Sequence, residues 1–187
     1  MNFTKDIEQA LDVLHVGGIM LYPTDTIWGI GCDATNEAAV EKIIHLKQRP
    51  AHKSFVVLVA SEREVMQYVA AVDLAVFDYL EKQTKPTTVI YQGAIGLADN
   101  VLAADGSVAI RICKDEFCRT LIKRFRKPIV STSANISNEP SPAIFAAIHP
   151  LVKQGVDYVV QHRQNEVANA QPSSIIKWTD GQVEVLR

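Results

Sequence analysis

The chain has 187 residues, of which 48% are hydrophobic and 21% charged, and its 19 basic and 21 acidic side chains give a formal net charge of −2. This length fits one domain with a sizeable core, and the composition excludes a disordered chain. The charge balance argues against a dedicated nucleic-acid binder, which is usually basic overall. No apolar stretch reaches the roughly 18 residues of a membrane span, and the N-terminus holds no signal-peptide core.

Hydrophobic periodicity and turn residues predict alternating helices and strands. In chain order, the first expected elements are a helix capped by Thr4, a strand at 19–22, a helix at 36–46, a strand at 55–60, helices at 61–69 and 73–83, and a strand at 87–91. After a long loop at 93–106 come a strand at 107–112, a helix at 115–125, a strand at 129–131, a helix at 141–148, and strands at 156–160, 174–178 and 182–186. This order predicts a single α/β domain over residues 1–187, built on a mixed sheet flanked by helices.

Local signals set several of these boundaries. Ser61 and Glu64 form a capping box, Gly17-Gly18 ends the first helix, and the Ser141-Pro142 pair predicts a helix start. Residues 179–181, Thr-Asp-Gly, predict a hairpin turn between the last two strands.

Several catalytic motifs are absent from the sequence. It contains no phosphate loop, no Gly-x-Gly-x-x-Gly fingerprint, no Gly-x-Ser-x-Gly elbow and no His-Glu-x-x-His helix. The five histidines are scattered, and Cys113 and Cys118 stand five apart without a second ligand pair, so we expect no metal site built from side chains. The odd cysteine count, completed by Cys32, indicates free thiols and a cytoplasmic location.

Three polar loops stand out. The first and third directly follow buried strands, which is where ligands bind in α/β sheets, and the second lies between a helix end and a buried strand. Residues 22–31 carry hydroxyls, a carboxylate and glycines, residues 46–54 carry three cations, and residues 130–141 are rich in hydroxyl and amide groups. Each loop also has a purely structural interpretation: a turn stabilised by its own side chains, a charged helix end, or a solvated loop. Arg111, at the end of a strand, is a candidate clamp for a carboxylate or phosphate, or else a surface ion-pair partner.

Taken together, these loops resemble the YrdC family, in its short single-domain threonylcarbamoyl-AMP synthase form. The resemblance rests on segments 22–34, 46–50, 107–111, 131–137 and 172–176, which include the Lys-x-Arg and Ser-x-Asn signatures as Lys47/Arg49 and Ser133/Asn135. It implies a twisted sheet with a positively lined concave cavity. It also implies an enzyme, a nucleotidyltransferase, that makes threonylcarbamoyl-AMP and pyrophosphate from L-threonine, bicarbonate and ATP with Mg²⁺.

The resemblance also implies partners and site residues. The product would pass to tRNA threonylcarbamoyl transferase proteins, with weak tRNA contact and no membrane contact. Lys47 and Arg49 would act on the phosphates as catalytic residues. Threonine would contact Thr26, Arg111, Ser131 and Ser173, and ATP would contact Arg49, Lys53, Ser107, Ser133, Asn135, Ser141 and Arg187.

The chain departs from the family pattern at residues 84–88, Thr-Lys-Pro-Thr-Thr, and at Trp28, and we expect no further C-terminal domain after Arg187. Two other functions remain open at this stage. One is an RNA-binding or ribosome-associated protein that uses the same cavity. The other is a relative that forms a carbamoyl-adenylate for a different acceptor.

Overall fold

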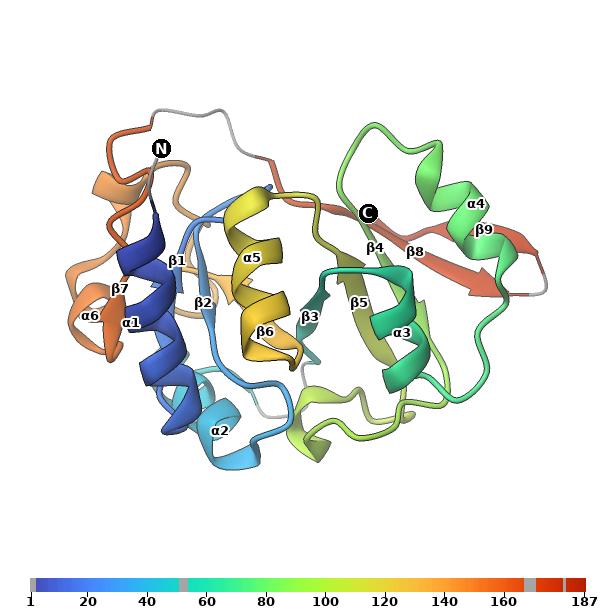
Figure 1. Cartoon of the computed structure of the whole chain (residues 1–187), viewed down its shortest axis with the longest axis horizontal. Helices are drawn as coiled ribbons and strands as arrows, with labels where there is room; N and C mark the ends of the chain where they lie inside the picture. Colours follow the sequence, from blue (N-terminus) through green and yellow to red (C-terminus); the bar gives the residue numbers. More distant parts are fainter. Residues whose placement is uncertain (1–2, 51–53, 167–170, 180) are drawn as a thin grey trace.

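The computed structural model describes residues 3–50, 54–166, 171–179 and 181–187. Its elements, shown in Figure 1, are α1 (Thr4–His15), β1 (Met20–Tyr22), β2 (Gly29–Gly31), α2 (Glu37–Lys47), β3 (Val56–Val59), α3 (Glu62–Tyr68), α4 (Ala75–Glu81), β4 (Thr87–Tyr91), η1 (Asp99–Val101), β5 (Val108–Ile112), α5 (Glu116–Phe125), β6 (Ile129–Ser133), η2 (Phe145–Ala147), α6 (Pro150–Gln154), β7 (Tyr158–Val159), β8 (Ser174–Thr179) and β9 (Gln182–Val185).

The predicted cap of α3 by Ser61 is confirmed, but the return bond of the capping box differs, because Glu64 bonds to the Ala60 amide and not to that of Ser61. The Ser61 hydroxyl accepts a hydrogen bond from the Glu64 amide at 3.4 Å, and Glu64 Oε2 accepts one from the Ala60 amide at 2.7 Å. At the end of α1, the amides of Gly17 and Gly18 bond back to carbonyls of the last helical turns, and Gly17 has φ +72°, which glycine adopts without strain. Both boundaries follow from local side-chain and backbone chemistry.

Two local predictions are wrong, and a third element is present but shorter than expected. The expected helix at 141–148 is only the short η2, and α6 begins instead at Pro150, where His149 Nδ1 accepts a hydrogen bond from the Leu151 amide at 3.1 Å. A capping residue followed by proline does mark a helix start here, but the pair is His149-Pro150 and not Ser141-Pro142. The cap of α1 is Phe3, with no side-chain hydrogen bond, and Thr4 is its first residue. The expected strand at 156–160 shortens to β7.

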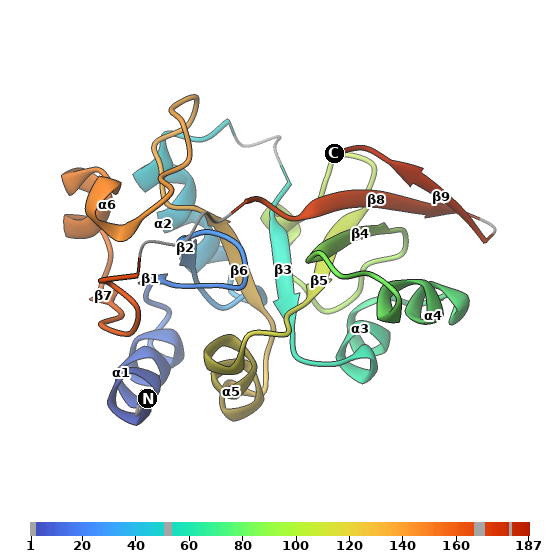
Figure 2. The same cartoon turned by 90° about the horizontal axis from the view of Figure 1, so that it is seen from above.

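Within the described residues, the strands form one nine-stranded sheet in the order β7-β1-β2-β6-β3-β5-β4-β8-β9, which runs across the view in Figure 2. Pairs β1–β7, β3–β5 and β4–β8 are parallel and the other pairs antiparallel, which confirms the mixed sheet. The hairpin between β8 and β9 is also present, although residue 180 of its turn lies outside the described residues.

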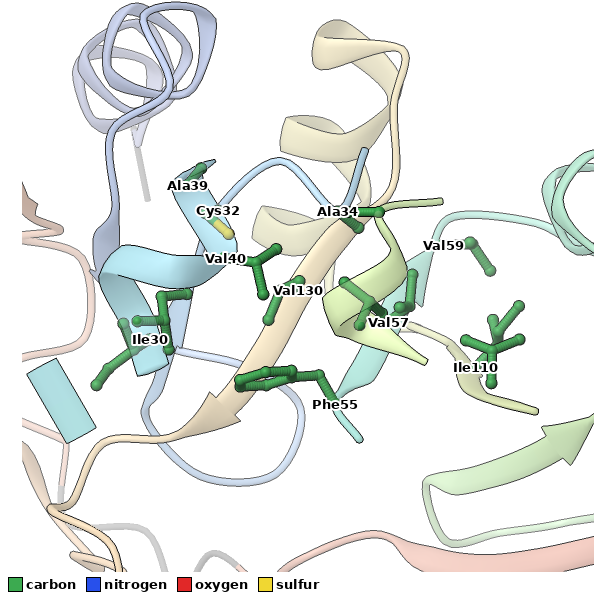
Figure 3. Close-up of a cluster of buried hydrophobic side chains, with 14 of the residues drawn as sticks. Ile30, Cys32, Ala34, Ala39, Val40, Phe55, Val57, Val59, Ile110 and Val130 are labelled. Carbon is green, nitrogen blue, oxygen red and sulfur yellow. The ribbon is translucent and has the colours of Figure 1, made fainter. Parts of the chain in front are cut away.

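Side chains alternate between the two faces of this sheet, and each face has its own core. Val57 and Ile110 point to the face covered by α2, α3 and α4, and Figure 3 shows them with Val40 of α2 and Phe55 in one buried cluster. Leu58 points to the opposite face, where α1 and α5 cover it. Burial on both faces explains why β3 reads as an unbroken apolar run.

The second face is only partly covered. Ala109 and Arg111 of β5, and Ser131 and Ser133 of β6, have the same alternation as Leu58 and Ile129, yet α1 and α5 do not lie over them. The open part of this face becomes the floor of a cavity. Among the described residues, no helix is long and apolar enough to cross a bilayer.

Candidate active site

A cavity of about 300 Å³ lies on the open part of the sheet. Its described lining contains Arg49, Arg111 and Arg187 but no acidic side chain. The other lining residues are Thr26, Ile27, Trp28, Gly29, Ser54, Phe55, Val56, Ile90, Ala109, Ser131, Thr132, Ser133, Ser141, Pro172, Ser173 and Ile175. Three cations among neutral hydroxyls, beside an apolar patch of strand residues, suit a small anionic ligand.

Arg111 is the most buried cation of the lining, with 4% of its surface exposed. Its Nη2 lies 3.0 Å from Asp25 Oδ1 in an ion pair and donates a hydrogen bond to Thr26 Oγ1 at 3.3 Å. Its Nε is buried and has no hydrogen-bond partner among the described residues. Asp25 therefore balances the buried charge of the guanidinium from one side.

The loop that carries Thr26 is held by a short relay of hydroxyl groups. Thr24 Oγ1 donates to the Ile27 carbonyl at 2.8 Å and accepts from the Thr26 amide at 3.1 Å. The two threonine hydroxyls are 2.9 Å apart, and because the Thr24 proton goes to Ile27, Thr26 is the donor between them. The structural interpretation of this turn is thus correct, and the turn also places Thr26 at the cavity.

Ser173 and Arg187, which both line the cavity, are joined by hydrogen bonds. Ser173 Oγ lies 2.9 Å from Thr88 Oγ1, and Thr88 is fully buried in β4. The Ser173 carbonyl accepts hydrogen bonds from Nε and Nη2 of Arg187, both at 3.2 Å. This carbonyl holds an exposed guanidinium at the rim of the cavity.

Arg49 is positioned by the two residues that precede β3. Its guanidinium carbon lies 4.6 Å from the centre of the Phe55 ring, and its Nη2 donates to the Ser54 carbonyl at 2.6 Å. Burial lowers the pKa of Arg49 below its ordinary value. Stacking on an aromatic ring fixes the plane of a guanidinium and so prepares it for bidentate contact with an anion.

Lys47 is almost completely buried and is not part of the lining. Its Nζ donates to the carbonyls of Ser133 and Asn135, at 2.5 Å each, and its own carbonyl accepts from the Ser137 amide. Desolvation, and after it the nearby Arg49 charge, lower the pKa of Lys47 to about 7. Lys47 therefore ties the end of α2 to the segment that follows β6.

Two other predicted contacts also lie away from the lining. The Asn135 amide nitrogen donates to the carbonyls of Ile136 and Glu139, at 3.0 and 2.7 Å. Ser107 Oγ donates to Asp105 Oδ1 at 2.6 Å. Lys53 lies outside the described residues. The remaining predicted residues all line the cavity: Thr26, Arg49, Arg111, Ser131, Ser133, Ser141, Ser173 and Arg187.

Some lining residues were not predicted from the sequence. Ser54 and Phe55 adjoin the Lys-x-Arg segment, and that position was the signal that could have found them. Ile175 lies in the family-like segment 172–176, but Ile90 carries no such signal, because it looks like an ordinary strand residue. Among the residues that the structure describes, no group of three or more His, Cys, Asp or Glu side chains could hold a metal ion.

Fold and site together define an α/β domain with a mixed sheet, whose uncovered face forms a cationic cavity for small polar ligands. Residues 12–187 match the profile of the Sua5/YciO/YrdC family, described as "Telomere recombination". The chain belongs to this family.

Curated relatives match nearly the whole chain. The threonylcarbamoyl-AMP synthase of Idiomarina loihiensis is 31% identical over 169 residues, covering 89% of this chain and 90% of that protein. The threonylcarbamoyl-AMP synthase of Xanthomonas euvesicatoria pv. vesicatoria is 32% identical over 187 residues, covering 98% of both chains.

Solved structures share the fold. A variant of P. abyssi Sua5 superposes with a TM-score of 0.89 at 23% identity over 100% of this chain, and E. coli YciO with 0.83 at 21% identity over 98%. P. abyssi Sua5 has also been solved in complex with L-threonine and gives a TM-score of 0.86 at 22% identity. This chain spans 88% of the YciO chain, but only 57% and 54% of the two Sua5 chains.

Proposed function

We propose that this protein is a threonylcarbamoyl-AMP synthase, which joins L-threonine, bicarbonate and ATP and releases pyrophosphate. The observation that carries the proposal is the match to synthases of that name over 89–98% of the chain. The cavity supports it, because all three substrates are anionic or carry a carboxylate, and the described lining offers three arginines without a competing acidic side chain.

In this proposal, Arg111, the most buried cation of the lining, binds the threonine carboxylate. Thr26, Ser131 and Ser173 surround the rest of the amino acid. Asp25 stands behind Arg111 and is outside the lining, so it fixes the guanidinium without repelling the substrate. The hydroxyl groups supply the neutral hydrogen bonds that distinguish threonine from an apolar amino acid.

We place the ATP phosphates between Arg49, Ser133 and Ser141, with Arg187 at the rim. Lys53 belongs to the same proposed contact set, whereas Ser107 bonds to Asp105 and lies outside the lining. Lys47 and Asn135 act as positioning residues in this arrangement, because their polar atoms hold the segment that carries Ser133.

The reaction then has two bond-forming steps. The neutral threonine amine attacks the bicarbonate carbon, and water leaves to give the carbamate. A carbamate oxygen next attacks the α-phosphorus, and the bond to pyrophosphate breaks. Because every partner is negatively charged, fixed arginines and alignment should supply most of the rate enhancement. Asp25 is held in an ion pair with Arg111, so we assign no side chain as the general base. In this proposal, the proton of the threonine amine passes to water or to a substrate oxygen.

The described lining does not fit a magnesium site of its own, because Mg²⁺ in proteins is usually held by carboxylates together with substrate phosphates. Mg²⁺ therefore belongs to the substrate as the ATP complex. A cytoplasmic location and transfer of the product to tRNA threonylcarbamoyl transferase proteins complete the proposal. All three cysteines are free and buried, as suits a reducing compartment.

The test is a pyrophosphate-release assay in which threonine, bicarbonate and ATP are omitted in turn. Release should require all three, and valine, which lacks the hydroxyl group, should be rejected more strongly than a missing methyl group explains. Release without threonine would favour a carbamoyl-adenylate-forming relative. No release under any condition, together with salt-dependent RNA binding, would favour a binding protein.

A further inference from the structure

A second hollow, also of about 300 Å³, lies between α3 and the C-terminal end of α5, which are neighbours in Figure 1. None of its lining residues belongs to the lining of the proposed active site. Four cationic side chains and one carboxylate line it, together with Ser61, Gln67, Tyr68 and Pro128. The charged residues are Arg63, Lys123, Arg126, Lys127 and Glu64.

Most of this positive charge has no countercharge. Lys127 pairs with Asp33 at 2.7 Å. Glu64 accepts a hydrogen bond from the Ala60 amide as part of the cap of α3. Within the described part of the chain, Arg63, Lys123 and Arg126 make no ion pair. Three exposed cations thus converge on one hollow in a protein whose net charge is −2.

Helix capping explains only part of this arrangement. Lys123 and Arg126 lie at the C-terminal end of α5, where the helix dipole favours a cation. Arg63 lies in the first turn of α3, where the dipole disfavours one. Stability alone therefore gives no reason to bring Arg63 to the same hollow, and mutual repulsion gives a reason against it.

We propose that this hollow is a second anion site, which binds a ligand carrying two or more phosphate groups. Arginine forks hold phosphate oxygens bidentately, and a lysine adds a point charge. Arg63, Lys123 and Arg126, which make no ion pair among the described residues, still leave an excess of positive charge after the Glu64 carboxylate is counted, and this excess suits a ligand with more than one phosphate better than a monoanion. Ser61, Gln67 and the half-buried Tyr68 offer neutral hydrogen bonds and a ring surface for the rest of the ligand.

The phosphate groups of the proposed ligand could belong to a free diphosphate or to the backbone of RNA. Two titrations distinguish these two sources. The ¹⁵N-labelled protein is titrated with inorganic pyrophosphate and, separately, with a single-stranded RNA oligonucleotide. The amides of Arg63, Gln67, Lys123 and Arg126 should shift with at least one probe. A response that saturates with pyrophosphate assigns the free ligand, and a response to RNA alone assigns the backbone.

The variant R63Q/K123Q should weaken the binding that shifts these amides at least about tenfold, because two charge-assisted contacts are lost. The control K5Q/K82Q removes the same charge elsewhere and should bind as the wild type does. R126G is a second variant, since glycine adopts the φ of +61° at this position without strain.

Absence of shifts at these amides with both probes would overturn the site. Equal affinity in R63Q/K123Q, R126G and wild type would also overturn it. Pyrophosphate release from ATP should stay at the wild-type level in these variants, because they leave the proposed active site intact. The second anion site and the synthase activity can therefore fail independently.

Discussion

The Nζ atom of Lys47 lies within hydrogen-bond distance of the Ser133 carbonyl, 86 residues further along the chain. The same nitrogen reaches the Asn135 carbonyl, so a single ammonium group joins α2 to the segment after β6. Two residues after Lys47, Arg49 enters the cavity, and Ser133 itself lines it. The two signature segments are therefore linked through a buried cation as well as through a shared ligand pocket.

This buried cation makes stability depend on pH. The pKa of Lys47 falls from 10.5 to about 7, so between these values the unfolded chain binds more protons than the native one. The free energy of unfolding of the wild type should therefore rise with pH relative to Lys47→Met, by up to about 1.4 kcal/mol per pH unit. Urea denaturation of both proteins at pH 7, 8 and 9 measures this difference, and parallel pH profiles would contradict it.

The ion pair of Arg111 with Asp25 should be strongly coupled. Both side chains are largely buried, so D25N leaves an uncompensated guanidinium and should cost about 3 kcal/mol of stability. Replacing both residues, in D25N/R111M, should recover a large part of that loss. A double-mutant cycle from urea denaturation gives the coupling energy. If the two single losses simply add, the pair has no special role in the fold.

Removal of the Arg49 charge should affect catalysis. R49Q loses the guanidinium that stacks on Phe55 and faces the cavity, and pyrophosphate release should fall on the order of 10²–10³-fold. The matched control is R124Q, which changes an exposed arginine in the last turn of α5. Near-normal release by R49Q would show that the proposed phosphate position is wrong.

The hydroxyl pair of Thr88 and Ser173 allows a more subtle test. Thr88→Val preserves the shape of a fully buried residue but removes the hydrogen bond to Ser173 Oγ, which should cost about 1–2 kcal/mol of stability. Because Ser173 lines the cavity, the KM for threonine should also rise, and Thr88→Ser should restore it. A change in the KM for ATP alone would place Ser173 beside the other substrate.

The sequence predicted the mixed sheet because its strands have strong local signals. The continuous apolar run at β3 and the capping box that follows it depend on neighbouring residues only. The strand β2 was not predicted, because Gly29–Gly31 has too few side chains to show a periodicity. Its pairing with β1 and β6 is a tertiary effect.

The same limit applies to the site. Polar residues that follow strands were correctly associated with a cavity, since strand ends position ligands in α/β folds. Whether a polar side chain faces that cavity or the protein interior depends on partners far away in the sequence. Lys47 and Asn135 satisfy backbone carbonyls, and nothing in their immediate neighbours distinguishes this role from ligand contact.

The lining of the cavity extends from Thr26 to Arg187, so it includes both early and late segments of the chain. During synthesis on the ribosome, the N-terminal strands emerge well before Ser173 and Arg187 close the opposite wall. A partly made chain thus has no complete substrate pocket, and contacts between such distant segments are expected to form late in folding. Newly made molecules should acquire ligand affinity only in the last stage of folding.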